Sequence, residues 1–227
     1  LVIIVLSGCE NKMTNILVFI KANGYIHESA EIGAKVIKEL EKSQPYSVQI
    51  SDDSLVFRES KLRNFNVIIF LSTSGDILDE EGKAALKSFI NSGGGFVGIH
   101  GATTTEKNWS WYGKLIGTYF TDHPKIQEAT LNTLVNDVPS TRHLSEKWIW
   151  SDEWYNWSHP LGGNFEVLVT VDESTYEGGN HPEYHPISWR QEYDGGRVWY
   201  TALGHKSESY KDEKFLKHII GGIEWVS

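Results

Sequence analysis

The chain has 227 residues, of which 40% are hydrophobic and 22% are charged, so it is long enough to fold as one domain with a sizeable core. The formal net charge is −9 and the Lys and Arg residues form no cluster, which argues against nucleic acid as a partner. Cys9 is the single cysteine, so the sequence allows no intramolecular disulfide.

The first residues are typical of a processing signal. A short apolar run, residues 1–6, precedes Ser7-Gly8-Cys9 and is too short to span a bilayer. This pattern resembles the end of a bacterial lipoprotein signal, whose cysteine is lipidated. We therefore expect residues 1–14 to be a signal remnant and tether, with Cys9 lipidated. That modification predicts an extracytoplasmic protein, periplasmic or at the surface, which meets the bacterial membrane only through a lipid anchor. The alternative is an ordinary strand or a frayed terminus.

The next stretch predicts a strand, a helix and a second strand. Residues 15–20 are almost all apolar, as in a buried strand, and residues 21–27 form the loop that leaves it. Ser29 is a suitable N-cap for a helix that Pro45 stops. Residues 47–50 then predict the second strand.

The same pattern repeats further along. Residues 66–71 form a continuous apolar strand, Asp79 can cap the helix that follows, and Gly93 closes it. Residues 96–99 give the next strand. Strands that alternate with helices predict parallel pairing through right-handed crossovers, which is a doubly wound α/β sheet.

The stretch from Gly93 to Thr104 is the centre of the functional prediction. Gly98 is expected to let a second backbone approach, and Gly101-Ala102 to form a sharp turn. His100 then projects from the carboxyl end of a strand, where open parallel sheets bind ligands.

The second half of the chain is expected to be an aromatic-rich connection followed by further strands and a last helix. Six of the nine tryptophans lie in this connection, which begins after Thr105: Trp109, Trp111, Trp148, Trp150, Trp154 and Trp157. The expected strands are 128–133, 165–171, 186–191 and 197–204, with a hairpin turn at Asp194-Gly195-Gly196 and a helix from about 212 to 225.

Four motifs in this order resemble the trehalose-utilisation (ThuA-like) family. They are Gly93-Gly94-Gly95-Phe96-Val97-Gly98-Ile99-His100-Gly101-Ala102, Gly117-Thr118-Tyr119-Phe120-Thr121-Asp122-His123-Pro124, Asp152-Glu153-Trp154-Tyr155, and Gly195-Gly196-Arg197-Val198-Trp199-Tyr200-Thr201-Ala202-Leu203-Gly204-His205. The resemblance implies a single domain over residues 15–227 with the class I glutamine amidotransferase-like fold: flavodoxin-like and doubly wound, with a mostly parallel sheet and helices on both faces. It also implies a role in disaccharide or glycoside catabolism, including pathways through 3-keto sugars.

The chain departs from the amidotransferases at the nucleophile. His100 occupies the place of their cysteine, so we expect no glutamine amidotransferase activity. His205 follows the last expected strand, with Glu208 three residues later, as the partner histidine does in that fold. We therefore expect His100 and His205 to converge on one cleft. His181-Pro182-Glu183 has a similar spelling, but no apolar strand leads into it, so we interpret it as a loop.

These residues predict acid-base chemistry on a small-molecule saccharide. His100 and His205 are expected to exchange protons at a carbon next to a carbonyl with help from Glu153, in a hydrolase or an isomerase. The expected substrate-binding residues are His27, Asp152, Tyr155, Trp154, His123 and Trp109. Aromatic rings suit the apolar faces of sugars, although some of the tryptophans are expected to cover a sheet edge or a contact between copies in a homo-oligomer.

Two other functions remain open at this stage. One is a sugar-binding or scaffold lipoprotein without catalysis, in which the histidines are structural and Asp152 and Glu153 form a solvated loop pair. The other is a metal-dependent hydrolase, with His100, His205 and His27 as candidate ligands of a divalent ion such as zinc. The sequence holds neither an HExxH nor a CxxC motif, so the cofactor stays undetermined.

Overall fold

The computed structural model describes residues 13–162 and 164–227. Cys9 and the expected lipidation signal lie outside these ranges, so the boundary between tether and domain stays a prediction. Among the described helices, none combines the length and apolar character that crossing a membrane requires.

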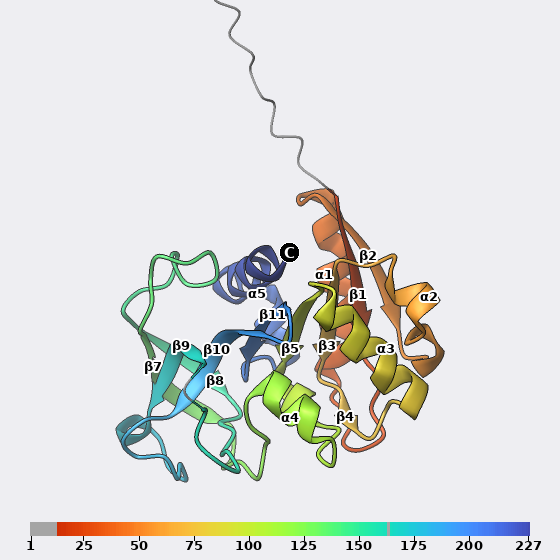
Figure 1. The fold of residues 1–227 in the computed structure, drawn as a ribbon. Coiled ribbons are helices and arrows are strands. Elements are labelled where there is room, and N and C mark those ends of the chain that lie inside the picture. Colours follow the sequence, from red (N-terminus) through yellow and green to blue (C-terminus); the bar gives the residue numbers. More distant parts are fainter. Residues whose placement is uncertain (1–12, 163) are drawn as a thin grey trace, which may run out of the picture.

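Helices are interspersed among the strands as far as α4, whereas five strands then follow one another without an α-helix before the last helix (Figure 1). The helices are α1 (Ser29–Glu39), α2 (Glu59–Leu62), α3 (Glu80–Asn91), α4 (Ser110–Ile116) and α5 (Glu213–Val226). The strands are β1 (Thr14–Phe19), β2 (Tyr46–Ser51), β3 (Val67–Leu71), β4 (Ser74–Gly75), β5 (Gly95–Ile99), β6 (Thr104–Thr105), β7 (Gln127–Thr133), β8 (Lys147–Asp152), β9 (Glu166–Asp172), β10 (Pro186–Tyr193) and β11 (Gly196–Thr201).

A mixed nine-stranded sheet organises this α/β fold. Its order is β2-β1-β3-β5-β11-β10-β9-β7-β8. The first five strands in this order pair in parallel, as expected, whereas every pairing from β11 to β8 is antiparallel. The turn at Asp194 and Gly195, both with positive φ, joins β10 directly to β11 and confirms the expected hairpin. The expectation of a mostly parallel sheet therefore holds for only one half of it.

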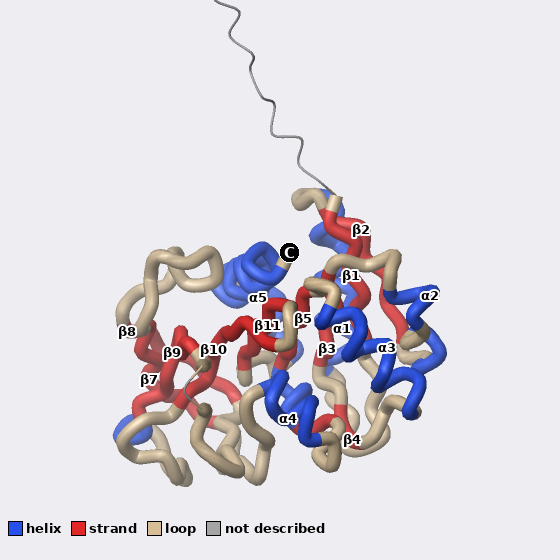
Figure 2. Tube along the Cα trace, in the orientation of Figure 1, coloured by secondary structure: helices blue, strands red, loops and turns tan. Residues whose placement is uncertain are grey.

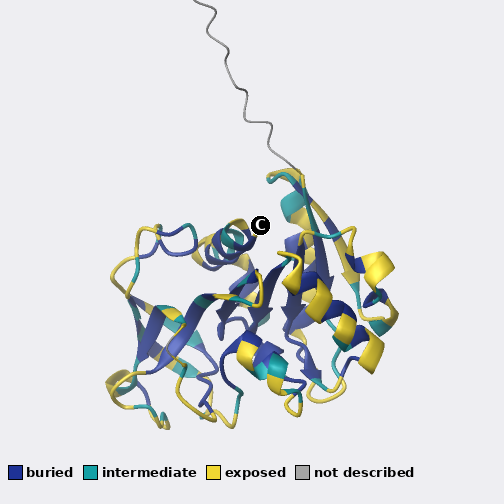
Figure 3. Cartoon of the chain, in the orientation of Figure 1, coloured by how far each residue is buried: buried dark blue, intermediate teal, exposed yellow. Residues whose placement is uncertain are grey.

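The core lies on both faces of the parallel strands. All residues of β3 and β5 are buried, which explains their continuous apolar sequences. The ring of Phe96 meets Tyr112 of α4 on one face, while Gly95 leaves room for Val226 of α5 on the other. Figure 3 shows the buried strands between helices whose outer faces are exposed. The helices thus hold β5 rigidly at the centre of the sheet.

Several boundaries differ from the sequence-based expectations. The aromatic connection contains α4 and the strand β8, neither of which was predicted. The tryptophans of β8 break the usual alternation of apolar and polar residues. The last strand ends at Thr201, not at Gly204. Ser29 does not cap α1, because its hydroxyl donates to the carbonyl of Gly204 at 3.0 Å. Asp79 does cap α3, accepting from the N–H of Gly82 at 2.7 Å.

Loops gather at the carboxyl ends of the parallel strands, close to β4 (Figure 2). Strand β4 pairs with β6, and Ser74 also forms a bridge with Ala22. The hydroxyl of Ser74 donates to the carbonyl of Tyr25 at 2.8 Å. The loops that follow β1, β3 and β5 are therefore tied together at this end of the sheet.

Candidate functional site

His100 stands at a sharp turn immediately after β5. Its φ is +49°, in the left-handed region that only a few non-glycine residues adopt. The hydroxyl of Tyr200 donates to the carbonyl of His100 at 2.9 Å and holds this conformation. The sharp turn was expected at Gly101-Ala102, but the strained residue is the histidine itself. Such strain is typical of functional turns.

Two glycines make this turn possible. A Cβ on Gly101 would lie 3.0 Å from the carbonyl oxygen of Thr73 and 3.1 Å from backbone atoms of Ser72. The close backbone approach expected at Gly98 is thus found at Gly101. Gly98 instead makes room for side chains, since a Cβ there would lie 2.7 Å from Ile116.

Hydrogen bonds fix the ring of His100, which is completely buried. Its Nδ1 lies 2.8 Å from the carbonyl oxygen of Ala202 and must donate to it, because a carbonyl only accepts. The neutral ring therefore carries its free lone pair on Nε2. The hydroxyl of Tyr155 lies 2.8 Å from that nitrogen.

Three more side chains converge on Nε2 of His100. The Nε2 of His27 lies 3.1 Å away, the Nδ1 of His205 3.2 Å, and the Oε2 of Glu153 3.5 Å. The Nδ1 of His205 and the Oε2 of Glu153 are 3.2 Å apart. One atom from each of these four residues, hereafter the histidine cluster, lies within 4.8 Å of the others. The sequence predicted that His100 and His205 would meet, and the structure brings them together with His27 and Glu153.

Asp152 fixes the backbone of two cluster residues, Glu153 and His205. Its carboxylate accepts the backbone N–H groups of Glu153, Gly204 and His205 at 3.0, 2.9 and 3.2 Å. The indole of Trp150 donates to it at 3.1 Å. Asp152 was expected to bind substrate; in the structure it is completely buried and both its oxygen atoms accept hydrogen bonds from the protein. It joins the end of β8 to the loop after β11.

A second carboxylate-histidine pair supports Tyr155. The Nε2 of His185 donates to the carbonyl of Tyr155 at 2.8 Å, and its Nδ1 contacts Glu173 at 2.6 Å. No sequence pattern pointed to Glu173, because its partner lies 12 positions away in an irregular loop. His181 lies in the same loop, as expected, and its Nε2 accepts the N–H of Trp157 at 2.9 Å. Neither histidine belongs to the histidine cluster.

Burial and mutual contacts set the charges of the cluster. Burial and the neighbouring His100 lower the pKa of His27 to about 3, so its ring is neutral. Burial alone would raise the pKa of Glu153, but His100 and His205 outweigh it and hold that pKa well below its usual range. The hydrogen bond with Glu153 raises the pKa of His205 despite partial burial. Glu153 and His205 therefore favour an ion pair.

The cluster opens to solvent on one side. The side chains of His205 and His123 are 19% and 38% exposed, and the Nε2 of His123 lies 3.1 Å from the Oε1 of Glu153. The ring of Tyr25 is exposed and lies 4.7 Å, between centroids, from that of His27. A depression of about 650 Å³ reaches His27 and is also lined by Ile26 and Glu28, but Tyr25 and the other three cluster residues do not line it. Tyr25 was missed from the sequence because a single aromatic residue in a loop carries no pattern.

The two tryptophans expected to bind substrate pack in or against the hydrophobic core. Trp154 is completely buried and its indole donates to the carbonyl of Gln127 at 3.0 Å. Trp109 stacks on Trp111 and Tyr112 of α4. Most of the aromatic segment thus builds the core rather than a sugar platform.

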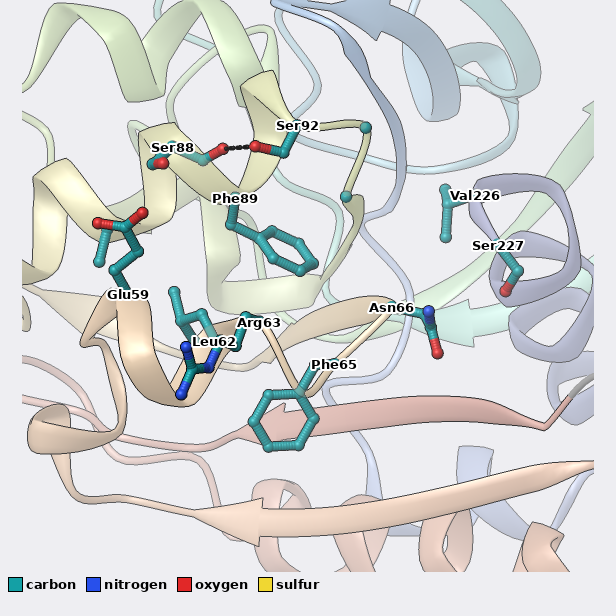
Figure 4. A pocket seen from close by; sticks show the side chains of 13 residues that line it. Glu59, Leu62, Arg63, Phe65, Asn66, Ser88, Phe89, Ser92, Val226 and Ser227 are labelled. Atoms are coloured by element: carbon teal, nitrogen blue, oxygen red, sulfur yellow. Dashed lines mark hydrogen bonds between the residues drawn. The ribbon is translucent and has the colours of Figure 1, made fainter.

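Two features lie outside the histidine cluster. Glu208 is exposed, and Glu153 rather than Glu208 is the carboxylate beside His205. A separate hollow of about 370 Å³ lies at the opposite ends of the parallel strands, beside Asn66, Phe89 and Val226 (Figure 4). None of the cluster residues lines it.

The four converging groups are capable of two kinds of chemistry. An imidazolium beside a carboxylate can give and take protons. Three imidazole nitrogens and a carboxylate oxygen are also ligands that zinc and related ions accept. The geometry therefore marks one site, formed by loops after β1, β5, β8 and β11.

Comparison with known proteins agrees with this architecture. A family model described as trehalose utilisation (ThuA) matches residues 15–226. A ThuA-like protein from Bacteroides uniformis is 23% identical with a TM-score of 0.81, over 96% of this chain and 92% of that one. A ThuA-like protein from Parabacteroides merdae is 18% identical with a TM-score of 0.74, over 95% and 90% of the two chains. A cytoplasmic protein from Salmonella typhimurium LT2 is 13% identical with a TM-score of 0.68, over 94% and 100%. The curated proteins gave no match.

Proposed function

Because the chain belongs to the ThuA (trehalose utilisation) family, which indicates a role in carbohydrate metabolism, we propose that it acts on a disaccharide or glycoside, including 3-keto forms. In this proposal Glu153 and His205 exchange protons with the sugar. The observation that carries it is the ion pair of these two residues at the open side of the histidine cluster.

The pair has the groups that sugar chemistry needs. Beside a carbonyl, the carboxylate of Glu153 removes a proton from carbon while the imidazolium of His205 donates to the carbonyl oxygen. In a hydrolysis, the carboxylate activates water and the imidazolium protonates the leaving oxygen. A sugar oxygen that enters between the two groups separates the ion pair, which moves both pKa values back toward their usual ranges. The site thus serves an isomerase or a hydrolase.

His100 has a different role from the one first expected. Its ring is completely buried beneath Tyr155 and His205, so in this proposal it orients the reacting pair instead of touching the sugar. Tyr25 and His123 are exposed neighbours of the cluster, Tyr25 beside His27 and His123 beside Glu153. The exposed ring of Tyr25 offers a flat face for the apolar side of a pyranose, while His123 offers a polar contact for a hydroxyl.

Turnover of saccharides by matched variants tests the proposal. Trehalose, other disaccharides, aryl glycosides and their 3-keto derivatives are incubated with the purified chain, and products are followed by NMR. We expect Glu153→Gln to lower the rate about 10²- to 10⁴-fold, the usual contribution of a general acid-base group. Glu208→Gln, an exposed carboxylate outside the cluster, is the control. If calorimetry shows that a sugar binds but the wild-type protein does not consume it, the proposed catalysis is wrong and the chain is a sugar-binding protein.

We also propose that the chain is a lipoprotein outside the cytoplasm and that its parallel half is flavodoxin-like and doubly wound. Leu6-Ser7-Gly8-Cys9 supports the first statement, and the strand order β2-β1-β3-β5 supports the second. Labelled palmitate should enter the protein in a bacterial host and should not enter the Cys9→Ser variant. Equal labelling of both would rule out lipidation at Cys9.

A further inference from the structure

We propose that His27, His100, His205 and Glu153 bind one divalent metal ion of the zinc type. The ion would be held by the Nε2 atoms of His27 and His100, the Nδ1 of His205 and the Oε2 of Glu153. These ligands come from four loops that are far apart in the sequence and meet at the carboxyl ends of β1, β5, β8 and β11.

The spacing of the four atoms fits tetrahedral coordination. Zinc bonds to histidine nitrogen and carboxylate oxygen are about 2.1 Å long, which places neighbouring ligands of a regular tetrahedron about 3.4 Å apart. The structure has 3.1 Å between the nitrogens of His27 and His100, and 3.2 Å between those of His100 and His205. Glu153 lies 3.2 Å from His205 and 3.5 Å from His100. All pairs fall within 4.8 Å, so a small shift completes the tetrahedron.

The hydrogen bonds of the cluster also favour a cation. The Nε2 of neutral His100 has one lone pair, yet it faces Tyr155 at 2.8 Å, His27 at 3.1 Å and His205 at 3.2 Å. One lone pair cannot accept three hydrogen bonds well. An ion among these nitrogens uses the lone pair of each ring at once.

The surroundings provide the outer contacts that metal ligands usually have. The Nδ1 of His100 donates to the carbonyl of Ala202, which fixes the tautomer that leaves Nε2 for a metal. His123 contacts the other oxygen of Glu153, and Asp152 anchors the backbone of both Glu153 and His205. Hydrogen bonds within the protein thus position these ligands in the absence of an ion.

The ligand types narrow the choice of ion. Three imidazoles and one carboxylate suit zinc and neighbouring transition metals, whereas Mg²⁺ and Ca²⁺ prefer oxygen ligands alone. An ion held by these four residues would polarise a carbonyl oxygen, or lower the pKa of a water, that binds it as a fifth ligand. With the ion bound, His205 and Glu153 are its ligands, so polarisation by the ion would take the place of proton exchange by this pair. That step rests on the proposed action on sugars, while the binding of the ion does not.

Metal binding by the purified chain is the direct test. The protein is stripped with a chelator, and Zn²⁺ is titrated by calorimetry and in competition with a chromophoric chelator, with Co²⁺ as a spectroscopic substitute. We expect one equivalent per chain and tetrahedral Co²⁺ absorption. His27→Gln, His100→Asn and Glu153→Gln should each weaken binding at least 100-fold, and His123→Gln about tenfold.

Controls separate this site from adventitious binding and from the sugar proposal. His159→Asn, which removes an exposed histidine, should bind as the wild type does, and circular dichroism checks that each variant folds. Absence of stoichiometric binding, or binding that the three ligand variants leave unchanged, would overturn the site. Stoichiometric zinc without any saccharide turnover would leave the site intact and contradict the proposed function. Full saccharide turnover by wild-type protein that binds no ion would support the proposed function and overturn the metal site.

Discussion

The Nδ1 atom of His100 donates to the carbonyl oxygen of Ala202 over 2.8 Å, across 102 positions of sequence. This contact joins the ends of the neighbouring strands β5 and β11 and directs Nε2 of His100 into the cluster. A side chain at position 100 must therefore accept a positive φ and also donate a hydrogen bond.

Two substitutions of His100 separate its backbone role from its chemistry. Asn tolerates the left-handed conformation and can donate to Ala202, whereas Ala does neither. We expect His100→Ala to lower the free energy of unfolding by about 1–2 kcal/mol more than His100→Asn does. Urea denaturation measures the difference. Equal stability of the two variants would show that the turn imposes no such requirement.

Asp152 is expected to matter for stability as well as for the site. It accepts four hydrogen bonds while completely buried, and Asn would replace one accepting oxygen by a donor that faces N–H groups. We expect Asp152→Asn to cost about 2–3 kcal/mol of unfolding free energy, the usual worth of hydrogen bonds to a buried charge. It should also reduce activity, because the loop that carries His205 loses its anchor. A change below 0.5 kcal/mol in urea denaturation would contradict this role.

Gly101 tests the close packing beneath His100. A Cβ there would meet backbone atoms at 3.0–3.1 Å, which cannot move as a side-chain end can. We expect Gly101→Ala to destabilise the fold by about 1–3 kcal/mol, as overpacking usually does. Gly162→Ala is the matched control, because a Cβ at Gly162 meets nothing within 4 Å. Thermal unfolding of both variants tests this expectation. Equal unfolding midpoints for the two variants would contradict close backbone packing at Gly101.

Tyr25 tests the open side of the site. Its ring is 68% exposed, so Tyr25→Ala should change the free energy of unfolding by less than about 0.5 kcal/mol. Loss of a stacking face should weaken saccharide affinity about threefold to tenfold. Ile149→Ala, at a residue that is 69% exposed on β8, should leave affinity unchanged. Calorimetric titration compares them, and equal affinities for all three proteins would remove Tyr25 from the binding surface.

His218 predicts how stability depends on pH. Burial lowers its pKa to about 4, below the unfolded value of 6.5, so the unfolded state binds more protons between these values. The contribution of neutral His218 to the free energy of unfolding is therefore fully present above pH 6.5. It falls as the pH drops toward 4, by about 2 kcal/mol between pH 7 and pH 5. His218→Asn can still donate to the carbonyl of Ser140 but carries no titrating ring. Its unfolding free energy should depend less steeply on pH than that of the wild type; parallel curves would contradict the assignment.

The parallel half of the fold was predictable because its signals are local. Continuous apolar runs marked β1, β3 and β5, and Asp79 marked the start of α3. The antiparallel half was harder, since β8 and α4 lie in an aromatic segment where core residues and ligand-binding residues look alike. Trp154 illustrates the problem: only its burial shows that it belongs to the core.

By itself, the sequence determined the family motifs, the histidine at the end of the central strand and the absence of a cysteine nucleophile at that turn. Only the tertiary structure decided that Glu153 faces the cluster while Asp152 faces the backbone. Adjacent residues at the end of a strand point in opposite directions, so their roles depend on what the neighbouring loops place against each side. The same holds for His27, His100 and His205, whose nitrogens meet only because four loops end at one edge of the sheet.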